Sequence, residues 1–181
     1  MSPLRRHHGG VAWAALLCGL LCASCLFGAN RGPRVLGYRH GTVYLTRAVS
    51  YRVGELPEGW RRLRTRARAI SFHHAATGAT ISTDAFCGAA YEDLPLPSLM
   101  GHLFAGFPTE RIVSTRSMRL AGREALRQVS HRTIDGVPLR FDAVVLKKHE
   151  CLFDFVLMTP PGGYAQALGT FDGFVNGFAY E

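Results

Sequence analysis

The stretch that decides the fold runs from Arg111 to Met158 and reads RIVSTRSMRLAGREALRQVSHRTIDGVPLRFDAVVLKKHECLFDFVLM. Asp135-Gly136 stands between two long apolar-flanked segments, and an Asp-Gly pair in that setting is the strongest short-range signal of a β-hairpin. Ala121-Gly122 and the polar segment 147–150 mark two further turns. The stretch therefore predicts a meander of four strands, over 111–120, 124–134, 137–148 and 151–158.

The last of these strands is largely apolar on both faces. One face carries Cys151, Phe153, Phe155 and Leu157, and the other carries Leu152, Asp154, Val156 and Met158. A strand with two apolar faces is typical of the centre of a sheet that is covered on both sides. We therefore expect this strand to be central and each face of the sheet to carry a helix.

Two helices are predicted, one before and one after the meander. Leu99, Leu103 and Phe107 recur at helical spacing after Asp93, which offers an N-cap, and this helix is expected to end near 106–108. Apolar residues at steps of three and one predict the second helix from Tyr164 to Phe178.

Upstream of the first helix the chain is rich in β-forming residues. Short strands are expected over 42–46 and 60–63, and a hairpin over 69–74 and 79–87. Residues 41–181 are therefore predicted to form a single α+β domain, an antiparallel, meander-rich β-sheet flanked by two helices.

This order of elements resembles the PsbP-like α/β/α sandwich, which occurs in the extrinsic subunit of the photosynthetic oxygen-evolving complex and in small bacterial lipoproteins. The residues that carry the resemblance are the turn Gly122–Leu126, the hairpin Asp135-Gly136 and the closing segment Phe171–Phe178. Gly122–Leu126, together with Cys151, also resembles uncharacterised lipoproteins of Gram-negative bacteria. The resemblance implies the fold. It implies no activity, because no functional residue of the photosynthetic subunit has a counterpart here.

The N-terminus is typical of an export signal. Arg5 and Arg6 precede an uncharged apolar run from Val11 to Phe27, which is the pattern of a secretory signal peptide. Leu21-Cys22-Ala23-Ser24-Cys25 resembles the lipobox of bacterial lipoproteins, although Cys22 stands where Leu, Val or Ile is usual. We expect a lipoprotein-type signal over 1–24.

The same resemblance implies lipid attachment at Cys25, with a flexible tether over 25–40. Ordinary cleavage near Ala29 and an uncleaved membrane anchor are the two alternatives. Leu26 follows the lipid-bearing residue, and the absence of Asp there favours the outer membrane over the inner one, with the protein facing the periplasm.

Five cysteines stand at positions 18, 22, 25, 87 and 151. Cleavage before Cys25 removes two and the lipid takes a third, so Cys87 and Cys151 remain as a pair in an oxidising compartment. A disulfide between them is the favoured interpretation. Two buried free thiols, or a reactive or metal-binding pair, are the alternatives.

The chain carries a formal net charge of +8, and its densest basic stretch is RRLRTRAR at 61–68. In an alternating strand Arg62, Arg64, Arg66 and Arg68 share one face. This stripe is a candidate contact for lipid head groups or another anionic surface. The alternative is an edge strand whose charges only protect it from pairing with another chain.

No catalytic, metal-binding or cofactor motif is found: the chain has no P-loop, no dinucleotide fingerprint, no H-E-x-x-H and no nucleophile elbow. Asp142, Asp154, Arg127 and Arg140 on the late strands are interpreted as solvated groups or cross-strand ion pairs. We predict a non-enzymatic binding or accessory module at the envelope, held to the membrane by its lipid, that serves an envelope transport or lipid-trafficking complex, with an envelope protein as partner and no nucleic acid. A carrier with an apolar pocket between sheet and helix is the first alternative, and an enzyme the second.

Overall fold

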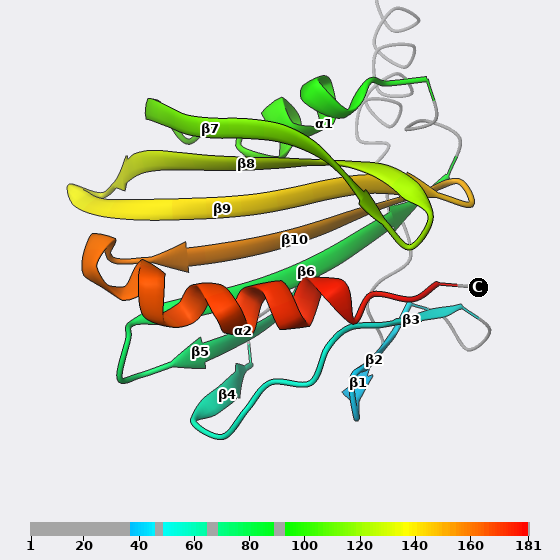
Figure 1. The fold of residues 1–181 in the computed structure, drawn as a ribbon, viewed down its shortest axis with the longest axis horizontal. Coiled ribbons are helices and arrows are strands. Elements are labelled where there is room, and N and C mark those ends of the chain that lie inside the picture. Colours follow the sequence, from blue (N-terminus) through cyan, green and yellow to red (C-terminus); the bar gives the residue numbers. More distant parts are fainter. Residues whose placement is uncertain (1–36, 46–48, 65–68, 89–92, 181) are drawn as a thin grey trace, which may run out of the picture. The chain divides into compact units, whose positions relative to one another are not determined.

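The predicted meander forms four neighbouring strands of a seven-stranded antiparallel sheet in a computed structural model of the chain (Figure 1). The structure describes residues 37–45, 49–64, 69–88 and 93–180, all within one compact unit, Gly32–Glu181. Within these ranges, no helix has the length and apolar character that crossing a membrane requires.

The predicted elements occur in the expected order, most with bounds within two residues of the prediction. The strands β1 and β3 and the short helix η2 were not predicted, and β1, β2 and β3 form a separate three-stranded sheet. In chain order they are β1 (Gly37–Arg39), β2 (Thr42–Tyr44), β3 (Ser50–Arg52), β4 (Trp60–Leu63), β5 (Ile70–His74), β6 (Ala79–Cys87), α1 (Leu96–Leu103), β7 (Thr109–Leu120), β8 (Arg123–Ile134), β9 (Val137–Lys148), β10 (Cys151–Thr159), η2 (Pro161–Gly163) and α2 (Tyr164–Asn176).

The last strand is central, as predicted. The large sheet has the order β4-β5-β6-β10-β9-β8-β7, so β10 has three strands on either side. Asp135 and Gly136 both have positive φ, 50° and 79°, as a two-residue type I′ turn requires. The turn pairs Ile134 with Val137 and thereby fixes the register of the β8–β9 hairpin.

Each face of the sheet carries one helix (Figure 1). Phe153, Phe155 and Leu157 of β10 pack in the larger core together with Phe171 and Phe174 of α2. The alternate residues of β10 face a smaller core, in which Leu152 joins Leu99, Met100 and Phe104 of the α1 region. The two faces predicted for β10 and the one-helix-per-face arrangement are therefore confirmed.

The last residues of the expected tether belong to the fold. Gly37–Arg39, within the range 25–40, form β1 and pair with β2 across a turn at His40 and Gly41. The ring of Tyr38 packs edge-on against Phe72 of the large sheet, with centroids 4.9 Å apart. This aromatic contact and the pairing with β2 hold the segment against the domain. A tether can therefore extend at most to residue 36.

Two further expectations are corrected. Asp93 does not cap α1, because the helix begins at Leu96 with Pro95 in the N-cap position and no side-chain cap. The helix also ends at Leu103 rather than near 106–108, because Phe104 leaves the helical conformation and Gly106 adopts a positive φ of 85°.

Candidate functional site

Cys87 and Cys151 form a disulfide, as predicted, with their Cα atoms 4.0 Å apart. They are direct partners in the β6–β10 ladder. The Gly88 N–H donates to the Glu150 carbonyl at 2.9 Å, which places the cysteines at a non-hydrogen-bonded position, where facing residues approach most closely. The bond therefore links two neighbouring strands in the middle of the sheet.

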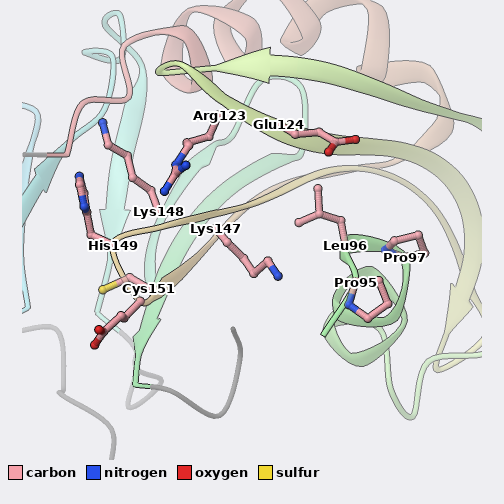
Figure 2. A pocket seen from close by; sticks show the side chains of 10 residues that line it. Pro95, Leu96, Pro97, Arg123, Glu124, Lys147, Lys148, His149 and Cys151 are labelled. Carbon is pink, nitrogen blue, oxygen red and sulfur yellow. The ribbon is translucent and has the colours of Figure 1, made fainter. Parts of the chain in front are cut away.

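A pocket of about 640 Å³ lies beside this disulfide (Figure 2). Its lining combines the start of β8, the β9–β10 turn and the start of α1: Pro95, Leu96, Pro97, Arg123, Glu124, Lys147, Lys148, His149, Glu150 and Cys151. Lys147 reaches toward the Pro95–Pro97 segment (Figure 2) and donates to the Leu94 carbonyl at 2.8 Å. Arg123, Lys148 and His149 lie on one side of the pocket (Figure 2), and we call these three residues its basic wall; Glu124 and Glu150 also line the pocket and offset part of its positive charge.

The turn that carries this basic wall is conformationally unusual. His149 and Glu150 both have positive φ, 50° and 58°, as a type I′ hairpin demands. The other two-residue turns place glycine at the second such position, whereas this turn has none. A non-glycine residue in the left-handed region costs about 1–2 kcal/mol, so the turn keeps a charged glutamate at the pocket at some loss of stability.

A second pocket, of about 220 Å³, lies on the α1 face. Four phenylalanines contribute to its wall, together with two aspartates of the neighbouring strands β6 and β10. The lining residues are Ala69, Ser82, Thr83, Asp84, Phe86, Leu103, Phe104, Phe107, Phe141, Asp154 and Val156. Phe107 is 45% exposed, so an apolar ring borders the pocket at the protein surface.

Asp84 and Asp154 face one another directly across the β6–β10 ladder. Asp154 is only 5% exposed, and among the described residues its Oδ1 atom has no hydrogen-bond partner. Burial, helped by the neighbouring Asp84 charge, raises the pKa of Asp154 to about 8. Asp84 is better supported, since its Oδ1 accepts the Ala85 N–H at 2.8 Å.

A polar cluster separate from the two pockets lies on the opposite face of the sheet, beneath α2. Arg127 donates two hydrogen bonds of 2.7 Å to the fully buried Asp142, and its Nη1 lies 2.7 Å from Oδ1 of Asp172 on α2. The Tyr164 hydroxyl donates to Asp142 at 2.7 Å, and the Arg140 guanidinium stacks on the Tyr164 ring, with Cζ 3.6 Å from its centroid.

This cluster, which we call the α2 ion cluster (Arg127, Arg140, Asp142, Tyr164 and Asp172), has its charges matched internally. The hydrogen bonds to Asp142 raise the pKa of Arg127, and burial raises the pKa of Tyr164 to about 12. Both groups therefore keep their protons at neutral pH. We interpret the cluster as the polar connection that fixes α2 on the sheet. The cross-strand ion pair expected for Arg127 is confirmed, but Asp142 is buried and not solvated.

The predicted basic stripe is only partly described. Arg62 and Arg64 are exposed, and β4 is an edge strand. β4 ends at Leu63, as predicted, so Arg64 lies just beyond the strand. Arg66 and Arg68, like the lipid-attachment residue Cys25, lie outside the described residues.

Sequence reasoning missed the facing aspartates of the second pocket, although a signal for them was present. Once Cys87 is paired with Cys151, antiparallel register places Asp84, three residues before the first cysteine, opposite Asp154, three residues after the second. Two carboxylates at such a position repel one another unless one is protonated or both share a cation. In the described part of the chain, no group of three or more His, Cys, Asp or Glu residues gathers in a metal-binding arrangement.

Comparison with family models and with curated protein sequences finds no match. Comparison with solved structures finds the solution structure of cyanobacterial PsbP (CyanoP) from Synechocystis sp. PCC 6803, with a TM-score of 0.55 and 14% identity over 72% of this chain and 86% of that one. It also finds LpqN, described as involved in cell envelope biogenesis of Mycobacterium tuberculosis, with a TM-score of 0.50 and 12% identity over 74% of this chain and 85% of that one. At these identities the likeness concerns the fold: the chain has a PsbP-like α+β fold, as its sequence suggested.

Proposed function

We propose that this protein is an exported, lipid-anchored envelope module that binds a partner or ligand without catalysing a reaction. The observation that carries the proposal is the disulfide between Cys87 and Cys151, because such bonds form and persist in oxidising compartments. The PsbP-like fold supports it, since LpqN shares that fold and is described as involved in cell envelope biogenesis.

The anchoring part of the proposal rests on the N-terminal sequence. The pairing of Cys87 with Cys151 leaves Cys25 as the one cysteine after the predicted cleavage point that has no role in the disulfide. A thiol at that position is what lipid attachment requires. Leu26 favours final placement at the outer membrane, facing the periplasm.

Membrane fractionation with mass spectrometry of the N-terminus tests the anchor. Cys25→Ser should leave the precursor uncleaved or release the protein from membranes. The matched control is Cys18→Ser, upstream of the lipobox-like segment, which should still yield a lipid-modified chain that begins at residue 25. An unmodified N-terminus beyond residue 25 in the native protein would overturn the proposal of a lipid anchor, and free thiols at both remaining cysteines would overturn export.

The surface that contacts the envelope is proposed to include the basic wall of the larger pocket (Figure 2). Arg123 and Lys148 belong to that wall, and each basic residue near an anionic surface adds about 1 kcal/mol of attraction, or roughly fivefold in affinity. Lys148→Glu should weaken sedimentation with phosphatidylglycerol vesicles more than the same reversal at Arg116, which is exposed on β7. Equal effects of the two reversals would remove this pocket from the proposed contact.

A second candidate function is a carrier of a small apolar ligand. The observation that favours it is the pocket of about 220 Å³ under α1, with its four phenylalanines. The α2 side of the sheet offers less room, because Phe153, Phe155 and Phe171 fill it with no exposed surface. The pocket is smaller than most small-molecule sites, which measure about 300–1,000 Å³, so the ligand would be small.

A further inference from the structure

We propose that the pocket under α1 binds a small organic ammonium ion, with its apolar body against the phenylalanines and its charged group at Asp154. The proposal rests on the carrier function just described and names the chemical class of its ligand. Three features of the pocket carry it: a buried carboxyl group with one oxygen that has no hydrogen-bond partner among the described residues, an aromatic wall, and a size that fits a single ring with a short side chain.

The carboxylate is the first feature. Asp154 lines the pocket with 5% of its surface exposed, and among the described residues nothing hydrogen-bonds its Oδ1. Buried polar atoms are paired in the great majority of cases, so an orphan that borders a cavity points to a missing donor. An ammonium group offers both the donor and the positive charge that two facing carboxyls favour.

The aromatic wall is the second feature. Phe86, Phe104, Phe107 and Phe141 line the same pocket as Asp154, and the faces of aromatic rings attract cations. Phe104 already has such a contact, since Cζ of the buried Arg132 lies 3.8 Å from its ring centroid. A wall of this kind suits an organic cation better than Ca²⁺ or Mg²⁺, which take about six to eight oxygen ligands.

The size is the third feature. An apolar cavity of about 150 Å³ holds benzene. The pocket of about 220 Å³ therefore has room for one six-membered ring and a chain of two or three atoms. 2-Phenylethylamine has this size and carries a primary ammonium group, so it is a suitable probe, and 2-phenylethanol is its neutral counterpart.

Binding should depend on pH in a direction that the surroundings of Asp154 determine. Burial, and then the charge of Asp84 on β6, raises its pKa. Arg132 on β8 and Lys147 on β9 share the α1 face of the sheet, and His102 lies on α1 itself. Asp154 must lose its proton to pair with the ammonium ion. Affinity for the cation should therefore rise about tenfold or more between pH 6 and pH 8, whereas affinity for the neutral alcohol should stay constant.

The experiment is calorimetric titration of the purified full-length protein with the amine, the alcohol and CaCl₂, each separately. We expect the amine to bind at least tenfold more tightly than the alcohol at pH 8. Asp154→Asn should abolish that preference and leave alcohol binding unchanged, which also serves as evidence that the variant is folded. The matched control, Asp135→Asn in the exposed β8–β9 turn, should bind both compounds as the unchanged protein does.

The outcomes separate this inference from the proposed function. Equal binding of amine and alcohol would overturn the ammonium site and leave the carrier function standing. Binding of neither compound would overturn both. Saturable Ca²⁺ binding that Asp154→Asn removes would make the aspartate pair a metal site and overturn the ammonium proposal.

Discussion

Replacing Arg127 by methionine should be the most damaging single change in the α2 ion cluster. The guanidinium gives Asp142 two hydrogen bonds of 2.7 Å, and Asp142 has no exposed surface. After the substitution, Asp142 keeps the hydrogen bond from the Tyr164 hydroxyl. Removing one partner of a buried ion pair costs about 3–5 kcal/mol, because the other charge stays buried without compensation.

Urea unfolding with the disulfide intact measures this loss. With a slope of about 2 kcal/mol per molar urea, the midpoint should fall by roughly 1.5–2.5 M. Asp172→Asn is the matched control. The Asp172 side chain is 41% exposed, so this change should lower the free energy of unfolding by less than about 1 kcal/mol.

A double substitution shows whether Arg127→Met destabilises the protein by leaving a buried charge without a partner or by removing packing contacts. Arg127→Met combined with Asp142→Leu removes both buried charges, so it should be more stable than Arg127→Met alone. The reasoning would be refuted if Arg127→Met lowered the urea midpoint by less than about 0.5 M. It would also be refuted if the double variant were less stable than Arg127→Met alone.

Three further predictions, which use four substitutions, test other parts of the fold. The pKa of Asp154 is raised to about 8 in the folded state from about 3.9 in the unfolded chain. Between about pH 3.9 and pH 8 the folded protein holds a proton that the unfolded chain has lost, so the free energy of unfolding falls as the pH rises through this range. Asp154→Asn should flatten that fall in Tm between about pH 5 and pH 8, and an unchanged slope would contradict the assignment. A Cβ on Gly177 would collide with the backbone of Gly54, whereas a Cβ on Gly173 meets open space. Gly177→Ala should therefore lower Tm, and Gly173→Ala should raise the free energy of unfolding by about 0.5–1 kcal/mol. Thermal unfolding of the two variants checks both expectations. Glu150→Gly relieves a positive φ of 58° and should stabilise by about 1 kcal/mol; a lower urea midpoint would speak against strain in that turn.

The sequence was sufficient for the four-stranded meander because its signals are local. Asp135-Gly136 fixes the register of β8 and β9 through one turn, and the two apolar faces of β10 require a layer on each side. The disulfide followed from cysteine counting. None of these inferences needs knowledge of which strands far apart in the chain are neighbours.

Burial of the polar groups could not be predicted in the same way. Arg127 and Asp142 are on the same face of one hairpin, so their pairing follows from the turn, but α2 supplies the cover that buries them. The facing of Asp84 and Asp154 depends on the pairing of β6 with β10, which are separated by α1 and three strands. Strand alternation alone leaves both residues as polar positions on a sheet face.

The unequal lengths of the two helices explain why the pocket of about 220 Å³ lies on the α1 face of the sheet. α2 has 13 residues and packs on β10 and β6, whereas α1 has 8 residues and packs mainly on β9 and β8. Because α1 ends at Leu103, Phe104 and Phe107 lie beyond the helix, and both are part of the pocket wall. The early end of α1, which apolar spacing did not predict, thus leaves Asp154 beside a cavity, whereas Asp142 on the other face is sealed by α2.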